Sequence, residues 1–291
     1  MDLNIEHPVP IVENISHDEF RSIYQNPQKP VILRGLWKDY PATSKWTIDY
    51  FKKEMGNIMV GVYDAGTEKA DRSTKAAPLK MKFGDYLDAI TSGPSDLRLF
   101  LFNILKHKPE LRKDFDYPPI TSMYLKQLPF MFFGGKDSVV RMHQDMDFAN
   151  VFLTQLKGKK LVVLFSPKYS RFLYRYPFNV HSSVDVEHPD FHKYPALRFV
   201  QGQTCILEPG DTLFMPSGYW HYIKYLEGGY AINQRALSPH PAHWFRGFYN
   251  VAVLSNLDDL MRSMMGESWY QYKLGQTYAR ANNAMSHLST S

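Results

Sequence analysis

The feature of this sequence that most limits its fold is a series of short β-branched and aromatic runs between residues 136 and 238. Residues such as Val, Ile, Tyr and Phe favour pleated strands, and turn residues separate the runs at fairly even intervals. We expect turns at Lys157-Gly-Lys159, Glu208-Pro-Gly-Asp211, Pro216-Ser-Gly218 and Gly228-Gly229. Because no helical pattern interrupts the second half of the series, the sequence predicts an antiparallel sandwich or barrel of the jelly-roll type.

Different patterns flank this series on both sides. The N-terminal part mixes extended pieces with short helices, one of which is capped by Thr47 and ends at Gly56. In the C-terminal part, apolar residues recur at helical spacing over 244–254 and 257–265, and a third helix is expected around 270–281. We therefore divide the chain into N-terminal helices and strands that pack on the barrel (1–135), a β-rich core (136–238) and a C-terminal helical segment (239–291).

The segment Met142–Phe152, MHQDMDFANVF, carries the residues that favour chemistry. Alternate side chains of a strand share a face, so His143, Asp145 and Asp147 would point the same way. A second histidine in a strand-like run, His221, follows much later in the chain, and the two strands could converge on one point. Two imidazoles and one carboxylate that leave the other positions of a metal ion open are the arrangement of non-heme Fe(II) oxygenases. The alternation by itself leaves both aspartates as candidate ligands.

Four segments around these residues carry a family resemblance. They are His143-Gln-Asp145, the stretch from Gln155 to Pro167, the stretch from Glu208 to Pro216, and Trp220-His221. Together they resemble the JmjC-type cupin-like hydroxylases, in particular the branches that act on protein asparagine and on the tRNA base wybutosine, and the resemblance extends over about residues 30–236.

The resemblance has direct implications for fold and chemistry. It implies a double-stranded β-helix of the cupin superfamily that uses Fe(II), 2-oxoglutarate and dioxygen to hydroxylate a C–H bond. It also implies that His143, Asp145 and His221 are the catalytic metal ligands. Asp145 is preferred to Asp147 because its spacing fits the family motif.

Lys160 is the main candidate for binding the co-substrate. It begins an apolar strand, where an unpaired ammonium group would be costly and a fixed anionic partner would relieve that cost. The resemblance assigns Lys160 to the distal carboxylate of 2-oxoglutarate and Asn233 to the wall of the co-substrate pocket. Asn150 is the candidate for a further family position, provided that a bulge absorbs two extra residues before it.

Two positions depart from the family pattern. Phe100 stands where the asparaginyl hydroxylases have a tyrosine hydroxyl group, and Val140 stands where they have a threonine. Tyr124 or Ser138 would have to replace these groups in the co-substrate site. The departures are the main argument for one other class of function, a non-catalytic binding module. A metal-binding cupin without 2-oxoglutarate chemistry is a further alternative.

Composition bears mainly on partners and compartment. The net charge of +5 arises from 34 basic and 29 acidic residues that are scattered along the chain, so nucleic acid is permitted as a partner but not indicated. The family resemblance, rather than composition, suggests a protein side chain as the substrate, with a tRNA or a small molecule as alternatives. The single cysteine, Cys205, suits a reducing compartment, and no secretory leader or membrane span is recognisable. We expect a cytoplasmic protein without membrane contact.

The C-terminal helices also predict self-association. A jelly-roll barrel fills its own interior, so the apolar faces over 244–254 and 257–265 need either the barrel wall or another subunit to cover them. Their content of aromatic residues and methionine is typical of interface cores. We therefore expect a two-fold homodimer in which these helices pack against their symmetry mates.

Overall fold

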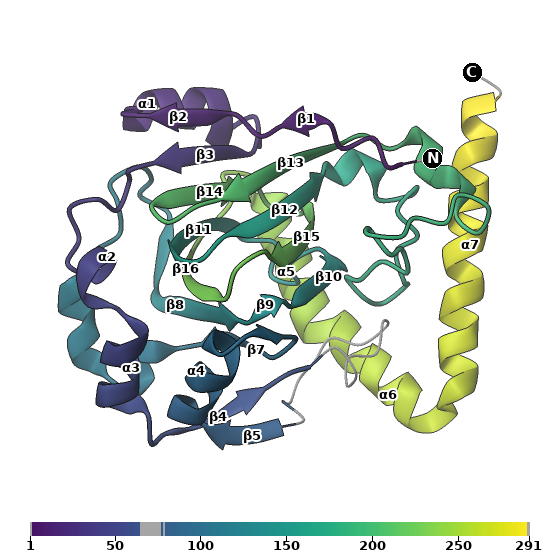
Figure 1. The fold of residues 1–291 in the computed structure, drawn as a ribbon. Coiled ribbons are helices and arrows are strands. Elements are labelled where there is room, and N and C mark those ends of the chain that lie inside the picture. Colours follow the sequence, from purple (N-terminus) through teal and green to yellow (C-terminus); the bar gives the residue numbers. More distant parts are fainter. Residues whose placement is uncertain (1, 65–76, 78, 290–291) are drawn as a thin grey trace.

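Two β-sheets face each other at the centre of the molecule (Figure 1). The structure is a computed structural model that describes residues 2–64, 77 and 79–289. In spatial order, the first sheet consists of β1 (His7–Pro8), β13 (Gly202–Leu207), β12 (Lys160–Phe165), β15 (Trp220–Tyr225) and β10 (Val139–His143). The second consists of β2 (Ile11–Glu13), β3 (Val31–Arg34), β14 (Asp211–Met215), β11 (Asn150–Lys157), β16 (Gly229–Ala236), β8 (Tyr124–Gly134) and β7 (Arg98–Phe102). This is the cupin jelly roll, which confirms the fold expected from the sequence.

The runs between residues 136 and 238 supply the centre of both sheets. Strand β12 pairs antiparallel with β13 and β15, and β11 pairs antiparallel with β14 and β16. The turn from β11 to β12 uses Gly158, whose φ of +74° lies in the left-handed region that glycine adopts without strain. Apolar side chains from the facing sheets, among them Leu153, Val162, Leu213 and Ile223, form the core between them.

The N-terminal residues form a layer on the outer side of the second sheet. Its helices are α1 (His17–Phe20), continued by the π turn η1 (Arg21–Gln25), α2 (Ala42–Lys45), α3 (Ile48–Met55) and α4 (Phe83–Thr91), with the 3₁₀ turns η2 (Ile104–Lys106) and η3 (Pro109–Asp114). Two small strand pairs join them, β4 (Met59–Val62) with β5 (Leu79–Lys82) and β6 (Pro94–Ser95) with β9 (Lys136–Asp137). As expected, Thr47 caps α3 by accepting a hydrogen bond from the amide of Tyr50. Phe51 of α3 and Phe83 of α4 then pack on Phe133 of β8.

The insert between β12 and β13 covers the outer side of the first sheet. It includes the 3₁₀ turns η4 (Pro167–Tyr169) and η5 (Pro195–Phe199) but no long helix. Its buried apolar residues, such as Tyr174 and Leu197, pack with Trp220 of β15 and with Ala281 of the last helix. The last helix, α7 (Glu267–Ser289), stands along this side of the molecule (Figure 1).

The C-terminal helices differ from the expectation in one respect. The segments expected as two helices over 244–254 and 257–265 form one continuous helical segment made of α5 (Pro241–Tyr249), the π turn η6 (Asn250–Leu254) and α6 (Ser255–Met265). The π turn closes through a bond from the Ser255 amide to the Asn250 carbonyl and adds one residue to the turn. This extra residue shifts the apolar periodicity, which is why the sequence reads as two helices.

Among the described residues, no helix combines the length and the apolar character needed to cross a membrane.

Candidate metal centre

The strand pair β10 and β15 brings the two predicted histidines together. The two strands run antiparallel, and their register places His143 directly opposite His221, with ring centroids 4.1 Å apart. Asp145 follows two residues after the end of β10, in the loop that leads to β11. One ligand atom from each of the three side chains lies within 4.8 Å of the other two, so small side-chain rotations would place all three around one metal ion.

Backbone carbonyls orient both imidazole rings for this purpose. The Nδ1 atom of His143 lies 2.8 Å from the carbonyl oxygen of Arg141, and the Nδ1 atom of His221 lies 3.3 Å from that of Tyr219. An Nδ1–H that donates to a carbonyl leaves Nε2 with its lone pair free for a metal. Burial, together with the neighbouring histidines, lowers the pKa of His143 well below its ordinary value, which favours the neutral ring that binds metal.

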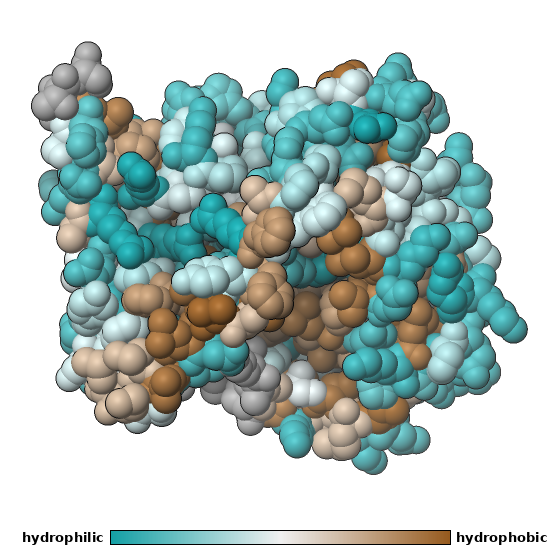
Figure 2. All heavy atoms as spheres, turned by 180° about the vertical axis from the view of Figure 1, so that it is seen from behind, coloured by the Kyte–Doolittle hydropathy of each residue, from teal (hydrophilic) through white to brown (hydrophobic). Residues whose placement is uncertain are grey.

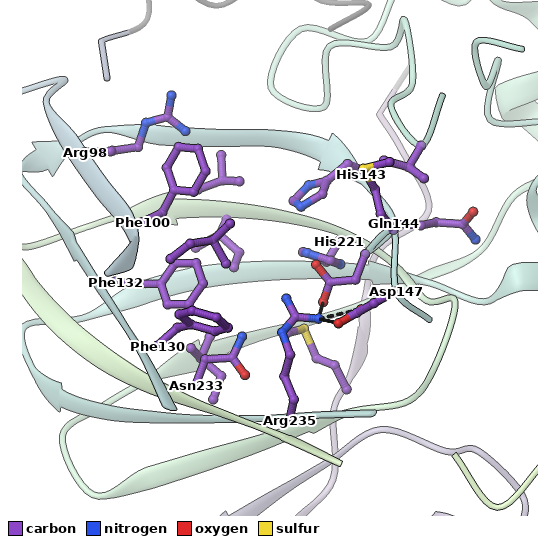
Figure 3. A pocket seen from close by; sticks show the side chains of 18 of the residues that line it. Arg98, Phe100, Phe130, Phe132, His143, Gln144, Asp147, His221, Asn233 and Arg235 are labelled. Carbon is purple, nitrogen blue, oxygen red and sulfur yellow. Dashed lines mark hydrogen bonds and ion pairs between the residues drawn. The ribbon is translucent and has the colours of Figure 1, made fainter. Parts of the chain in front are cut away.

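Arg235 of β16 distinguishes the two aspartates. Its buried guanidinium group lies 2.6 Å from both carboxylate oxygens of Asp147, but 3.4 Å from the nearest oxygen of Asp145 (Figure 3). Asp147 is therefore held by the arginine, while Asp145 remains in the group with His143 and His221. Burial is the largest single influence on the Asp145 carboxyl and would raise its pKa, but the charges of Arg235, His221 and His143 together outweigh it and lower that pKa to about 2.

A cavity of about 450 Å³ lies beside the three residues. Its volume is within the usual range for small-molecule sites. Apolar side chains from β7, β8 and η6 form much of its wall, among them Phe100, Leu101, Leu128, Phe130, Phe132 and Val251. In Figure 3 the labelled phenylalanines line one side and the histidines stand at the other, so the cavity joins an apolar wall to the possible metal site.

Lys160 lines the same cavity from the first residue of β12. Only 1% of this residue is exposed, and its Nζ atom lies 4.4 Å from the ring centre of Tyr225. Burial lowers the pKa of Lys160 to about 7, and no carboxylate of the described residues opposes that effect. Such a group is suited to bind an anion that enters the cavity.

The other residues named from the sequence are divided between the cavity and the core. Asn233 of β16 lines the cavity with a buried side-chain oxygen, and Phe100 and Val140 line it too. Asn150 and Tyr124 are not among the lining residues. Asn150 lies an odd number of positions from Leu153, which does line the cavity, so the strand alternation turns its side chain to the opposite face.

The side chains of the excluded residues have other environments. The Asn150 side chain accepts a hydrogen bond of 2.9 Å from the Ser217 amide. Tyr124 packs against Phe152 in the layer beneath the N-terminal helices. The Ser138 hydroxyl group donates to the carbonyl of Gly135 and is fully buried. The structure therefore brings Lys160 and Asn233 to the cavity, but not these three residues.

Sequence reasoning missed several polar residues of the cavity, among them Arg98, His181 and Arg235. The signal for Arg235 was present, because it follows Asn233 by two positions and so shares its face of β16. His181 lies in the insert before β13, and its ring stacks on His143 with centroids 5.5 Å apart. No periodicity marks an insert of this kind, so its approach to the site could not be found from the sequence.

Comparison with known proteins adds a family and several relatives. Residues 17–250 match the family described as Cupin-like domain. The chain is 29% identical over 243 residues to lysine-specific demethylase 8 from Xenopus tropicalis, an alignment that covers 79% of this chain and 53% of that protein. It is 30% identical over 250 residues to tRNA wybutosine-synthesizing protein 5 from Gallus gallus, which covers 77% of this chain and 76% of that protein.

A third relative illustrates how the domain occurs in larger proteins. Lysine-specific demethylase JMJ21 from Arabidopsis thaliana is 28% identical over 245 residues, with 76% of this chain and 24% of that protein covered. The chain thus spans about half the length of the demethylase 8 proteins that it matches, and a smaller part of the plant protein.

Proposed function

This chain belongs to the cupin-like family of JmjC type, and on that premise we propose that it is an Fe(II)- and 2-oxoglutarate-dependent oxygenase that hydroxylates a C–H bond. The observation that carries the proposal is the position of Lys160. A buried lysine that has no carboxylate partner in the described part of the chain lines the same cavity as two histidines and an aspartate that can hold one metal ion. A metal site alone does not need such a cation, whereas a dicarboxylate that binds beside the metal does.

In this proposal His143, Asp145 and His221 hold the iron. The donor set of two imidazoles and one carboxylate suits Fe(II) and leaves open positions. When bound, the iron supplies the activation of dioxygen that removes hydrogen from an unactivated carbon and returns a hydroxyl group. The protein's own part is to hold the ligands, and the carbonyls of Arg141 and Tyr219 do this for the two rings.

Lys160 and Asn233 bind the co-substrate. The ammonium group of Lys160 pairs with the distal carboxylate of 2-oxoglutarate, and the Asn233 amide lines the pocket beside it. Arg98 also lines the cavity, near Phe100, and brings a second positive charge to that end (Figure 3). Phe100 and Val140 offer no hydroxyl groups to the distal carboxylate. Its binding therefore depends more strongly on Lys160 here than in a site that also has a tyrosine and a threonine.

The wall of the cavity keeps water away from the reacting centre. Phe100, Phe130 and Phe132 present their rings to the cavity, and none of them offers a hydrogen-bonding group to solvent. A dry wall strengthens the pairing of Lys160 with a carboxylate and prevents side reactions with water.

The rim of the cavity favours a protein side chain as the substrate. Exposed apolar residues border it, namely Leu101, Leu128 and Val251, and such residues suit contact with a protein better than with the phosphates of a nucleic acid. The relatives are named as lysine demethylases and as a tRNA-modifying protein, so an N-methyl carbon of a protein and a tRNA base are the alternatives. Removal of an N-methyl group also begins with hydroxylation of its carbon, so the C–H step is common to these reactions.

Succinate release tests the proposal. Purified protein with Fe(II), 2-oxoglutarate and a cell lysate should release succinate, and mass spectrometry of that lysate should find oxygen adducts that require all three. The Lys160→Met variant is the matched negative control. A protein that binds metal but not 2-oxoglutarate would be a cupin with other chemistry, and one that binds both without any succinate release would be a non-catalytic module.

We further propose that the protein forms a two-fold homodimer through α5, η6 and α6. In the described part of the chain the apolar residues of these helices face outward, and brown side chains gather over them in the lower left of Figure 2. They include Trp244, Phe245, Phe248, Leu260, Met264 and Met265. Phe245, Phe248 and Met264 are each more than 70% exposed, and exposed apolar residues gathered on one segment mark an interaction site.

A cytoplasmic location remains a proposal that rests on cysteine usage. Cys205 is the single cysteine of the chain, and burial raises the pKa of its thiol to about 12. Such a thiol is unreactive and fits a compartment in which structural disulfides are not used.

A further inference from the structure

The helical segment α5–η6–α6 turns its small and polar residues toward the protein. Its buried residues are Gly247, Asn250, Ser255 and Asp258. Successive buried residues are three, five and three positions apart, whereas one face of a regular helix repeats every three or four positions. The spacing of five falls where the π turn η6 adds one residue between Asn250 and Ser255. The π turn therefore keeps this polar face continuous along the segment, and such turns occur often at functional sites.

The first two buried residues, Gly247 and Asn250, contact the loop that carries Asp145. A Cβ atom at Gly247 would lie 2.0 Å from the carbonyl oxygen of Asp147, so only a glycine allows α5 to approach this closely. One turn later, the Asn250 side chain donates a hydrogen bond of 3.1 Å to the carbonyl of Met146. The helix thus contacts the two residues that directly follow Asp145.

The rest of the molecule holds the same loop from other sides. Arg235 pairs with both Asp145 and Asp147, and the Ser217 hydroxyl group donates to the carbonyl of Phe148. Phe148 has a φ of +52°, an uncommon conformation for a large side chain, and Arg246 of α5 lies 4.5 Å from its ring centre. The loop is therefore held by β16, by Ser217 and by the helical segment of α5 and η6.

The loop needs such support because Asp145 lies outside both strands. Strand β10 ends at His143 and β11 begins at Asn150, so the ladder that fixes the two histidines does not reach the aspartate. We propose that Gly247 and Asn250 are positioning residues of the metal centre, and that α5 with η6 acts as a clamp that sets the place of Asp145. This inference rests on the proposed function, because it assumes that Asp145 is a metal ligand.

The first test compares two glycine variants by their affinity for Mn(II), which binds such sites without turnover. Gly247→Ala forces the loop or the helix to move and should weaken Mn(II) binding by about tenfold to a hundredfold, the usual effect of disturbing groups behind a metal ligand. Gly275→Ala is the matched control, because it lies in α7 where an added Cβ meets no heavy atom within 4 Å. Its Mn(II) affinity should equal that of the unaltered protein.

A second pair of variants removes a hydrogen bond without adding bulk. Asn250→Ala should weaken Mn(II) binding, whereas Asn256→Ala should not, because Asn256 lies in α6 and donates to the Ala252 carbonyl on the exposed side. With Co(II) at saturation, the visible absorption bands should change in Gly247→Ala and Asn250→Ala only, since these bands report the geometry of the ligands. A loss of helix packing alone would not change them.

The outcomes separate the clamp from the proposed function. If the unaltered protein binds no Mn(II), both proposals fail. If it binds Mn(II) and the Gly247→Ala and Asn250→Ala proteins bind it equally well with unchanged Co(II) bands, the clamp alone is refuted. If Gly247→Ala does not fold, the Asn250→Ala and Asn256→Ala pair decides the question.

Discussion

The Lys160→Met substitution should stabilise the protein when 2-oxoglutarate is absent, although it removes the co-substrate site. Burial lowers the pKa of Lys160 from 10.5 to about 7, a difference that corresponds to roughly 5 kcal/mol of unfolding free energy when the lysine is fully protonated. The Tyr225 ring, 4.4 Å from Nζ, offsets about 1–2 kcal/mol of this. A methionine of similar length avoids the desolvation cost, so we expect a gain of about 2–3 kcal/mol near pH 7.

The pH dependence distinguishes this cause from better packing. The folded protein loses the Lys160 proton near pH 7, whereas the unfolded chain keeps it until about pH 10.4. The unfolded state therefore binds more protons across this window, and the contribution of Lys160 to stability becomes less unfavourable as the pH rises. The advantage of the variant should be largest at pH 6 and fall to about half of that value at pH 9.

Thermal unfolding monitored at pH 6, 7 and 9 provides the measurement. At pH 7 the metal-free Lys160→Met protein should melt about 4–8 °C above the unaltered protein. Lys159→Met is the control, because Lys159 is half exposed and pairs with Glu208 at 2.7 Å, so its loss should change stability by less than about 1 kcal/mol. With Mn(II) present, 2-oxoglutarate should raise the melting temperature of the unaltered and Lys159→Met proteins but not that of Lys160→Met.

Two results would refute this reasoning. A Lys160→Met protein that melts lower than the unaltered protein at every pH would show that the lysine is stabilised by groups other than a bound anion. A melting-temperature difference that stays constant from pH 6 to pH 9 would show that Lys160 does not titrate in this range.

Three further predictions follow from the site and the surface. His143→Ala and His221→Ala should abolish Mn(II) binding, whereas Asp147→Ala should retain most of it, as plasma emission analysis of the metal content can show. If Asp147→Ala loses the metal and the two histidine variants keep it, Asp145 is not the carboxylate ligand. The affinity of the Mn(II)-loaded protein for 2-oxoglutarate should fall by up to about tenfold per pH unit above pH 7, as Lys160 loses its proton; calorimetry at pH 6.5 and 8.5 tests it, and equal affinities would contradict it. Light scattering at micromolar concentration should give a dimer mass for the intact chain and a monomer mass for a Leu260→Arg, Met264→Arg double variant, and a monomeric intact chain would exclude the dimer.

Much of the architecture could be predicted because the signals are local. Strand-forming runs, turn glycines such as Gly158 and the Thr47 cap are properties of a few adjacent residues, and the structure forms them where they were expected. The alternation expected for a strand drew attention to His143, Asp145 and Asp147, although the strand ends at His143 and both aspartates lie in the loop that follows. Lys160 could also be predicted as a binding residue from a local signal. The apolar run that follows it indicates a buried ammonium group, which is costly unless an anion pairs with it.

Tertiary structure decided what depends on contacts between distant segments. The preference for Asp145 over Asp147 depends on Arg235, which comes from a strand nearly ninety residues later and pairs with both carboxylate oxygens of Asp147, while Asp145 groups with the histidines. The exclusion of Asn150 from the cavity required the register of β11, since one position along a strand reverses the face of a side chain.

The C-terminal segment shows the same division. Its sequence determined that helices form there and that they carry apolar residues, but not which of their faces would meet the protein. The structure turned Gly247 and Asn250 inward and the apolar residues outward, because the loop after Asp145 offers backbone carbonyls that only small or hydrogen-bonding residues can approach. Periodicity along one chain describes the faces of a helix, whereas the surface that each face meets is set by the packing of the whole molecule.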